Sequence, residues 1–273
     1  MLALSACDRD TGGDGRAAAP PGAPETTEQA HAAPAGEPSI DWFDGDVDAA
    51  FALAKSEDKP LFLYWGAEWC PPCHQIKDQI FSKLEFIEKS RLFVPVYLDG
   101  DTERAQKLGD QFGVVGYPTI IVFSADGKEL TRIPGGLDIG LYAEVLDLTL
   151  QGVRPVAEIV TAVVAGESVS DDDYRLLGFY SWSQDNDRAL AGMDKVQAFD
   201  AMATSCPASL AAASARLYAE YLRAALEAEK DEEDPRPMSA AQRTLALERV
   251  HVILADDDLS AASFPVVQGA PLA

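Results

Sequence analysis

Two cysteines separated by two prolines form the motif of this sequence whose residue types and spacing best suit a chemical reaction: Cys70-Pro71-Pro72-Cys73. A thiol pair at this spacing serves either as metal ligands or as a redox centre. The chain of 273 residues contains only four cysteines and three histidines, one of them His74 beside the motif. Because a structural zinc site needs four ligands in a closed geometry, this set falls short of one. We therefore expect redox chemistry of the two thiols, with no metal and no cofactor; a soft copper(I) site is the alternative.

The residues around the motif predict a strand that passes into a helix. Residues 61–67 form a nearly continuous apolar run after Pro60, which suits a central strand buried on both faces. Pro71 and Pro72 fit the first turn of a helix, where the amide protons that they lack have no partner. Apolar residues at helical spacing, including Leu84, continue that helix over residues 75–90. The cysteine pair is thus expected at a strand-to-helix junction.

Further elements alternate along the same part of the chain and predict an α/β domain over residues 39–152. The turn at Asp126-Gly127 favours an antiparallel pairing of the two strands that flank it. We expect helices over residues 49–55, 102–112 and 141–150, and strands over residues 92–98, 119–123 and 129–133.

Two segments resemble the signature regions of the thioredoxin superfamily. They are Tyr-Trp-Gly-Ala-Glu-Trp-Cys-Pro-Pro-Cys at residues 64–73 and Gly-Val-Val-Gly-Tyr-Pro-Thr at residues 113–119. A bare Cys-x-x-Cys is a weak signal, but the preceding strand, the following helix and the later Tyr-Pro-Thr make the match specific. The resemblance implies the thioredoxin fold, a central mixed sheet flanked by helices, and thiol-disulfide exchange on other proteins.

The resemblance also implies the roles of the two catalytic cysteines. Cys70 is the attacking sulfur, because helix amides at the junction stabilise its thiolate, and Cys73 closes a disulfide with it as the resolving thiol. One position departs from the family: the buried acidic residue that many members place six positions before the first cysteine is Tyr64 here. A phenol with a pKa of about 10 is a poor base at neutral pH. The proton of Cys73 must then pass to water, to Glu68 or to His74, and we count neither side chain as catalytic.

Five residues are expected to contact the substrate: Trp69, Pro71, Pro72, Tyr117 and Pro118. In the superfamily the proline that matches Pro118 has a cis peptide bond and faces the dithiol, and the backbone beside it pairs with the substrate strand. Tyr117-Pro118 should do the same. Trp69 is expected to shield the disulfide, although a lone aromatic residue could equally belong to the core.

The amino-terminal segment predicts a lipid anchor on Cys7. Residues 1–7 end in Leu-Ser-Ala-Cys, which resembles the lipobox where bacterial lipoprotein precursors are cleaved before an acylated cysteine. Asp8 resembles the signal that keeps some of these proteins in the inner membrane. No basic segment or apolar stretch of about 7 to 15 residues precedes Cys7, so a stray cysteine is the alternative. Residues 8–38 are rich in Ala, Pro and Gly and are expected to form a disordered tether.

The charge of the chain excludes several partners. Forty-five acidic residues against 22 basic ones give a net charge of −23, which argues against nucleic acids and anionic lipid surfaces. No run approaches the roughly 18 apolar residues of a membrane-spanning helix. The membrane would therefore be reached through the lipid anchor only.

Residues 153–273 predict a second, all-α domain rich in alanine. Pro155 opens one expected helix, Ser170 caps another, and longer helices are expected over residues 186–203, 207–230 and 239–256. The default role of this domain is structural, with client binding as the alternative. Cys206 is expected to be a single buried thiol, and a third redox cysteine is the alternative.

These observations predict a protein-disulfide reductase or disulfide carrier in the bacterial periplasm, tethered to the inner membrane. Its substrates would be thiols or disulfides of other proteins, and an upstream membrane or soluble redox donor would supply electrons. The sequence leaves the direction of electron flow open. The rival hypothesis is a non-catalytic assembly factor with a thioredoxin fold that binds a client or handles copper(I).

Overall fold

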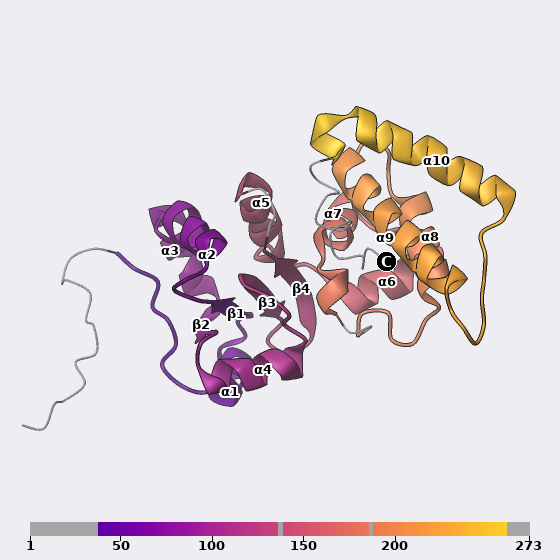
Figure 1. Cartoon of the computed structure of the whole chain (residues 1–273). Helices are drawn as coiled ribbons and strands as arrows, with labels where there is room; N and C mark the ends of the chain where they lie inside the picture. The colour runs from indigo at the N-terminus through magenta and orange to yellow at the C-terminus, as the bar shows by residue number, and fades with distance from the viewer. Residues whose placement is uncertain (1–37, 136–138, 186–187, 261–273) are drawn as a thin grey trace, which may run out of the picture. The chain divides into compact units, whose positions relative to one another are not determined.

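The computed structural model describes residues 38–135, 139–185 and 188–260 (Figure 1). The predicted lipid site Cys7 and residues 8–37 of the predicted tether lie outside these ranges. Four strands form one sheet: β1 (Leu61–Gly66), β2 (Val94–Asp99), β3 (Thr119–Phe123) and β4 (Glu129–Pro134). Their order is β2-β1-β3-β4, with β1 parallel to β2 and antiparallel to β3, and β3 antiparallel to β4. This is the mixed sheet that the resemblance implied.

Helices cover both faces of this sheet (Figure 1). Leu61 and Leu63 of β1 are buried against α1 (Val47–Glu57) and α4 (Glu103–Phe112). Phe62 and Tyr64 belong to the opposite face and are buried with residues of α3 (Leu84–Lys89) and α5 (Ile139–Thr149). The central strand is therefore buried on both faces, as its continuous apolar run predicts.

The single helix expected over residues 75–90 is wrong, because the chain forms several shorter pieces there. They are α2 (Pro71–Ile76), the π-helical turn η1 (Lys77–Phe81), α3, and the 3-10 turn η2 (Ser90–Leu92). Lys83 has an extended backbone, with φ −76° and ψ 133°, which separates η1 from α3. The wider π-turn and this break change the helical phase. Ile80 and Phe81 stay buried, whereas Leu84, expected on the buried face, is 56% exposed.

The other expected elements of this part of the chain are present with small shifts at their ends. The Asp46 carboxylate accepts the Ala49 amide proton at 2.6 Å and starts α1. The Thr102 hydroxyl caps α4 in the same way through the Ala105 amide at 3.2 Å. Local capping therefore determines where these helices begin.

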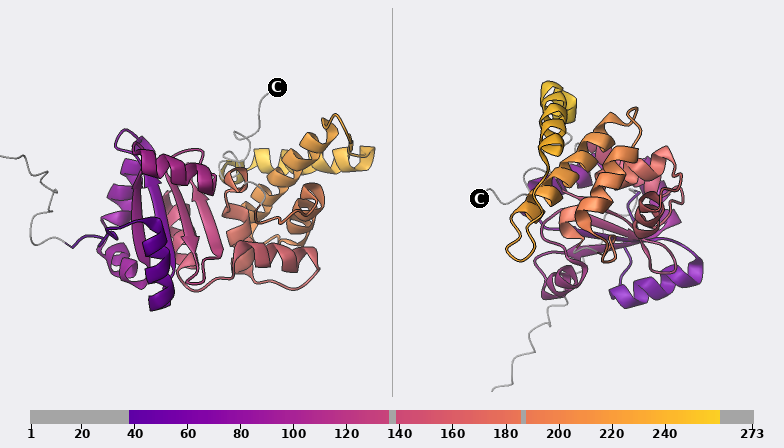
Figure 2. Two further views of the ribbon diagram at one scale, coloured as in Figure 1. Left: turned by 90° about the horizontal axis from the view of Figure 1, so that it is seen from below. Right: turned by 90° about the vertical axis from the view of Figure 1, so that its right-hand side faces the viewer.

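The rest of the described chain is helical, and Figure 2 shows its helices as one group. The helix expected over residues 186–203 begins later than predicted, because residues 188–192 form turns and Asp194 caps a helix that begins at Lys195. No helix in the described ranges is both long and apolar enough to span a membrane. The elements are α6 (Val156–Val164), α7 (Asp171–Phe179), η3 (Trp182–Gln184), α8 (Lys195–Ser205), α9 (Ala211–Glu229) and α10 (Ala240–Ala255).

Candidate active site

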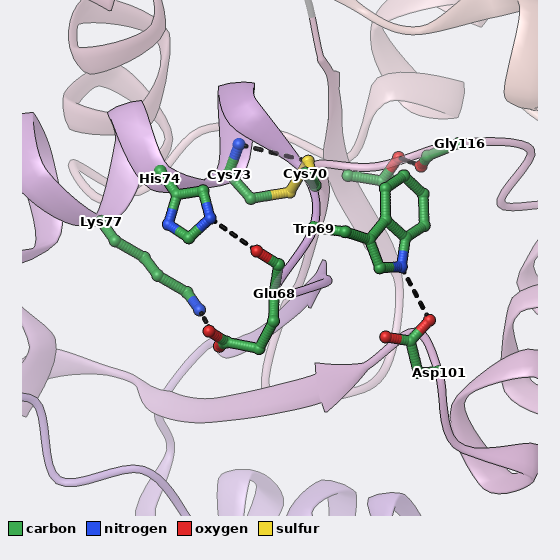
Figure 3. The surroundings of a disulfide bond; sticks show 9 residues. Glu68, Trp69, Cys70, Cys73, His74, Lys77, Asp101 and Gly116 are labelled. Carbon is green, nitrogen blue, oxygen red and sulfur yellow. Dashed lines mark hydrogen bonds and ion pairs between the residues drawn. A yellow bond between two sulfur atoms is a disulfide. The ribbon is translucent and has the colours of Figure 1, made fainter.

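Cys70 and Cys73 form a disulfide at the start of α2, with their Cα atoms 5.2 Å apart (Figure 3). Cys70 is the N-cap residue of α2, and its sulfur accepts a hydrogen bond from the Cys73 amide at 3.2 Å. Because Pro71 and Pro72 carry no amide proton, the Cys73 amide is the first donor after Cys70. Cys70 is 2% exposed and Cys73 is fully buried, so Cys70 is the sulfur closer to solvent. The structure thus brings together the two cysteines predicted from the sequence.

The loop that contains Tyr117 and Pro118 lies against this disulfide. The Tyr117-Pro118 peptide bond is cis, as expected, and Tyr117 packs against the cluster formed by Ala67 and the two cysteines. The Tyr117 hydroxyl donates to the Gly100 carbonyl oxygen at 3.1 Å. The loop is therefore fixed beside the sulfur atoms by packing and by a hydrogen bond.

Two glycines make room for this loop, and the sequence reasoning missed both. A Cβ atom on Gly100 would lie 2.3 Å from the Tyr117 ring. A Cβ atom on Gly135 would lie 2.9 Å from the Pro118 side chain and 3.1 Å from its carbonyl oxygen. A larger residue at either position would force the loop to shift. Both glycines directly follow strands of the sheet, and this position is the signal that could have identified them.

Trp69 lies at the surface beside the disulfide, so it does not belong to the core. Its side chain is 66% exposed, and its ring centroid is 6.2 Å from that of Tyr117. The indole amine donates to the Asp101 carboxylate at 2.9 Å (Figure 3). Asp101 was not predicted. It follows β2, whose last residue pairs with the end of the parallel strand β1, so it lies near the motif that follows β1.

Glu68 and His74 are both engaged away from the sulfur atoms. The Glu68 carboxylate pairs with the Lys77 ammonium at 3.0 Å, and the His74 ring lies 2.6 Å from the Glu68 carbonyl oxygen (Figure 3). The hydrogen bond from Lys77 and then its charge lower the pKa of Glu68, which weakens it as a base. Among the described residues, no hydrogen bond joins either side chain to a cysteine sulfur.

Tyr64 is buried beneath the motif in an aromatic cluster. Its ring centroid lies 5.5 Å from that of Tyr97 and 5.0 Å from that of Phe81. Its hydroxyl finds no hydrogen-bond partner among the described residues. Burial raises the pKa of Tyr64 far above its ordinary value, so the phenol stays neutral and cannot act as a base at neutral pH.

Cys206 is buried at the end of α8 and is the one free thiol among the described cysteines. Burial, followed by the charge of Asp171, raises the pKa of Cys206 to about 11. The thiol therefore stays protonated at neutral pH, which is typical of a structural cysteine.

The fold and the cysteine site together define a thioredoxin-like domain. Residues 47–149 match the family model of the thioredoxin-like domain, so this part of the chain is such a domain. The mixed sheet flanked by helices, with further helices after residue 150, confirms the fold class expected from the sequence.

Two named relatives are similar to part of this chain. Over 105 residues the chain is 30% identical to the disulfide bond reductase DsbH of Chlamydia pneumoniae, covering 32% of this chain and 61% of that protein. Over 129 residues it is 34% identical to the thiol:disulfide interchange protein DsbD of Cronobacter sakazakii, covering 45% of this chain and 21% of that protein. A solved DsbH oxidoreductase structure is 22% identical and covers 46% of this chain and 95% of that one, with a TM-score of 0.36. The chain thus spans less than two thirds of the length of both relatives.

Proposed function

We propose that the protein is a thiol-disulfide oxidoreductase that acts on cysteines of other proteins through Cys70 and Cys73. The observation that carries this proposal is the disulfide at the start of α2, directly beside the cis Tyr117-Pro118 loop. The names of the relatives, a disulfide bond reductase and a thiol:disulfide interchange protein, support the same activity. As a reductase or disulfide carrier, the protein would take electrons from an upstream redox donor.

The reaction follows from the order of the two sulfur atoms. In the reduced protein, the Cys70 thiolate attacks one sulfur of a client disulfide, which forms a mixed disulfide and releases the other client thiol. The Cys73 thiolate then attacks Cys70, which releases the second client thiol and leaves the Cys70-Cys73 disulfide. The Cys73 amide supports the first step, because it donates to the Cys70 sulfur and favours the thiolate. The proton of Cys73 passes to water, since the Glu68 and His74 side chains are both engaged away from the sulfur atoms.

The surface around the disulfide supplies the substrate contacts in this proposal. Trp69 offers an exposed aromatic face, and Pro71 and Pro72 leave no amide proton that would compete with the client backbone. Tyr117 and Pro118 present their backbone beside the sulfur atoms. In the described part of the chain, the Tyr117 amide and carbonyl form no hydrogen bond with another backbone group. They are thus available to pair with an extended client segment.

Replacing Cys73 by alanine should trap clients, because attack by Cys70 proceeds while the resolving thiol is absent. The full chain carrying Cys73→Ala, recovered from cells and run on a non-reducing gel, should carry adducts that a reductant removes. The double variant Cys70→Ala, Cys73→Ala is the matched control and should carry none, since only Cys206 then remains in the described chain. A folded Cys73→Ala protein without adducts, or equal adducts on the control, contradicts exchange on proteins.

The cell envelope is the location we propose, with the protein tethered to the inner membrane by a lipid on Cys7. The Leu-Ser-Ala-Cys segment and the Ala/Pro/Gly-rich segment after it support this location. The protein expressed from its own gene should incorporate labelled palmitate, and Cys7→Ser should move it from the membrane to the soluble fraction. An unlabelled protein, or a Cys7→Ser variant that stays in the membrane fraction, contradicts the anchor.

A further inference from the structure

Thr119, the first residue of β3, is fully buried next to the loop that contacts the disulfide. Its hydroxyl lies 2.8 Å from the Gly116 carbonyl oxygen, so it closes a short turn that contains Tyr117 and Pro118. Among the described residues, no other hydrogen-bond donor reaches this carbonyl oxygen. The Thr119 hydroxyl therefore holds the peptide group between Gly116 and Tyr117 in place.

This peptide group has two polar ends with different partners. Its carbonyl belongs to Gly116 and accepts from Thr119, whereas its N–H belongs to Tyr117 and is proposed above to pair with the client. Hydrogen bonds in a chain polarise one another, so a bond accepted by the carbonyl makes the N–H of the same group a stronger donor. A contact that supports the Thr119 hydroxyl can thus act on the N–H that binds the client.

Gln184, in the segment after α7, supplies such a contact. Its side-chain oxygen lies 3.1 Å from the Thr119 hydroxyl oxygen, and the residue is only 6% exposed. Gln184 also lines a cleft beside the loop, together with Gly116, Tyr117 and Pro118. The two residues in contact are 65 positions apart in the chain, so this contact joins the later helices to the loop at the disulfide.

The direction of these hydrogen bonds follows from counting protons. The Thr119 hydroxyl has one proton but faces two oxygen atoms, and the Gly116 oxygen is the closer one. A carboxamide keeps its shape when it is turned by 180°, which exchanges its oxygen and its amine. With the amine toward Thr119, Gln184 donates to the hydroxyl and the hydroxyl donates to Gly116. Every proton in this series then has one acceptor.

Hydrogen bonds also hold Gln184 itself in place. It is the last residue of η3, and its backbone amide donates to the Ser181 carbonyl oxygen at 3.1 Å. The Ser181 amide donates to the Arg132 carbonyl oxygen at 2.9 Å, which attaches this turn to β4. The Trp182 indole amine donates to the Leu177 carbonyl oxygen at 2.9 Å, which attaches it to α7. The side chain of Gln184 thus extends from a fixed backbone.

We propose that Gln184 is a positioning residue for client binding. Its amine donates to the Thr119 hydroxyl, the hydroxyl donates to the Gly116 carbonyl oxygen, and this series fixes and polarises the peptide group whose N–H, on Tyr117, pairs with the client backbone. Gln184 itself does not touch the client, so its effect is confined to clients that offer a backbone to the loop. This inference rests on the proposed function and gives a residue outside residues 47–149 a part in it.

Two kinds of substrate separate this role from a general structural one. One is an extended peptide with a single cysteine in a mixed disulfide with 2-mercaptoethanol, and the other is bis(2-hydroxyethyl) disulfide, which has no peptide group. The pre-reduced full chain is mixed with each substrate, and the second-order rate constant of its oxidation is measured in a single turnover. In both reactions the protein is oxidised to the Cys70-Cys73 disulfide while the substrate leaves as two thiols.

Gln184→Met should lower the rate constant for the peptide about three- to tenfold, the change expected for the loss of one hydrogen bond. The rate constant for the small disulfide should stay unchanged, because this substrate cannot pair with the Tyr117 backbone. Thr119→Val should lower the rate constant for the peptide at least as much. Adding Gln184→Met to Thr119→Val should cause no further loss, since the two residues act in series. Thr119→Ser keeps the hydroxyl and should keep the rate constant for the peptide.

Val160→Ala is the matched control, because Val160 is fully buried in α6 and its truncation loosens the later helices without removing a polar contact. It should keep the wild-type ratio of the two rate constants. A Gln184→Met protein with the wild-type ratio, or losses from Gln184→Met and Thr119→Val that simply add, overturn the inference while the proposed function stands. A Thr119→Val protein with the wild-type ratio overturns it as well, and this test does not change Gln184. If neither substrate oxidises the wild-type protein, the proposed function fails and the inference fails with it.

Discussion

At the scale of single residues, Arg132 on β4 is a buried charge that the fold must compensate. Its side chain is fully buried and donates to the Glu129 carboxylate at 2.8 and 2.9 Å and to the Phe112 carbonyl oxygen at 2.6 Å. The same carboxylate accepts a hydrogen bond from the Tyr180 hydroxyl at 2.9 Å. A buried charge is costly unless it is paired and hydrogen-bonded. This pair therefore joins β4 to α4 and to the segment that follows α7.

Arg132→Met should lower the free energy of unfolding by about 3 to 5 kcal/mol, because it leaves the Glu129 carboxylate, whose side chain is only 14% exposed, without its cation. Urea denaturation of the full chain measures this loss. The double variant Arg132→Met, Glu129→Gln should lose less than Arg132→Met alone, since it buries no unpaired charge. Lys107→Met, which breaks an exposed pair with Glu103, is the control and should leave the urea midpoint nearly unchanged. An Arg132→Met midpoint equal to that of the wild type would show that the buried pair contributes nothing.

Residues of the site that are close in sequence could be predicted, and those that come from distant segments could not. Cys70 and Cys73 form one short motif, and Tyr117-Pro118 forms another, so a local sequence pattern identifies each of them. Asp101 reaches Trp69 only because two parallel strands end side by side. Contacts of this kind depend on tertiary structure and have no local sequence pattern.

At the scale of elements, the strands were predicted well because β1 and β3 are buried along their whole length. A continuous apolar run of strand length carries that information by itself. The helix after the cysteine motif was not predicted correctly, because apolar spacing does not distinguish an α-helix from one interrupted by a π-turn. Lys83 breaks the helix in an extended conformation that nothing in its residue type requires.

The β4 edge of the sheet is covered in part by a segment far from it in the sequence. A free strand edge would expose unpaired backbone groups. The Ser181 amide covers part of this edge through its hydrogen bond to the Arg132 carbonyl oxygen. The segment after α7 therefore protects part of this edge of the sheet.

At the scale of the whole molecule, the sheet and the later helices share buried surface. Ile133 of β4, Leu146 of α5 and Leu177 of α7 belong to one cluster of buried apolar residues. A domain boundary near residue 152 stays a prediction. The shared cluster indicates that the later helices would affect the stability of the thioredoxin-like domain.

The Cys70-Cys73 pair is expected to exchange disulfides with other proteins, and its reduction potential is the most direct test of this activity. The full chain is equilibrated in glutathione and dithiothreitol buffers, quenched by alkylation, and the oxidised fraction is read by mass spectrometry. We predict one two-electron transition between about −270 and −120 mV, the range of thiol-disulfide exchange proteins, with Cys206 a thiol throughout. A pair that stays oxidised below about −300 mV would be a structural disulfide and would contradict the account.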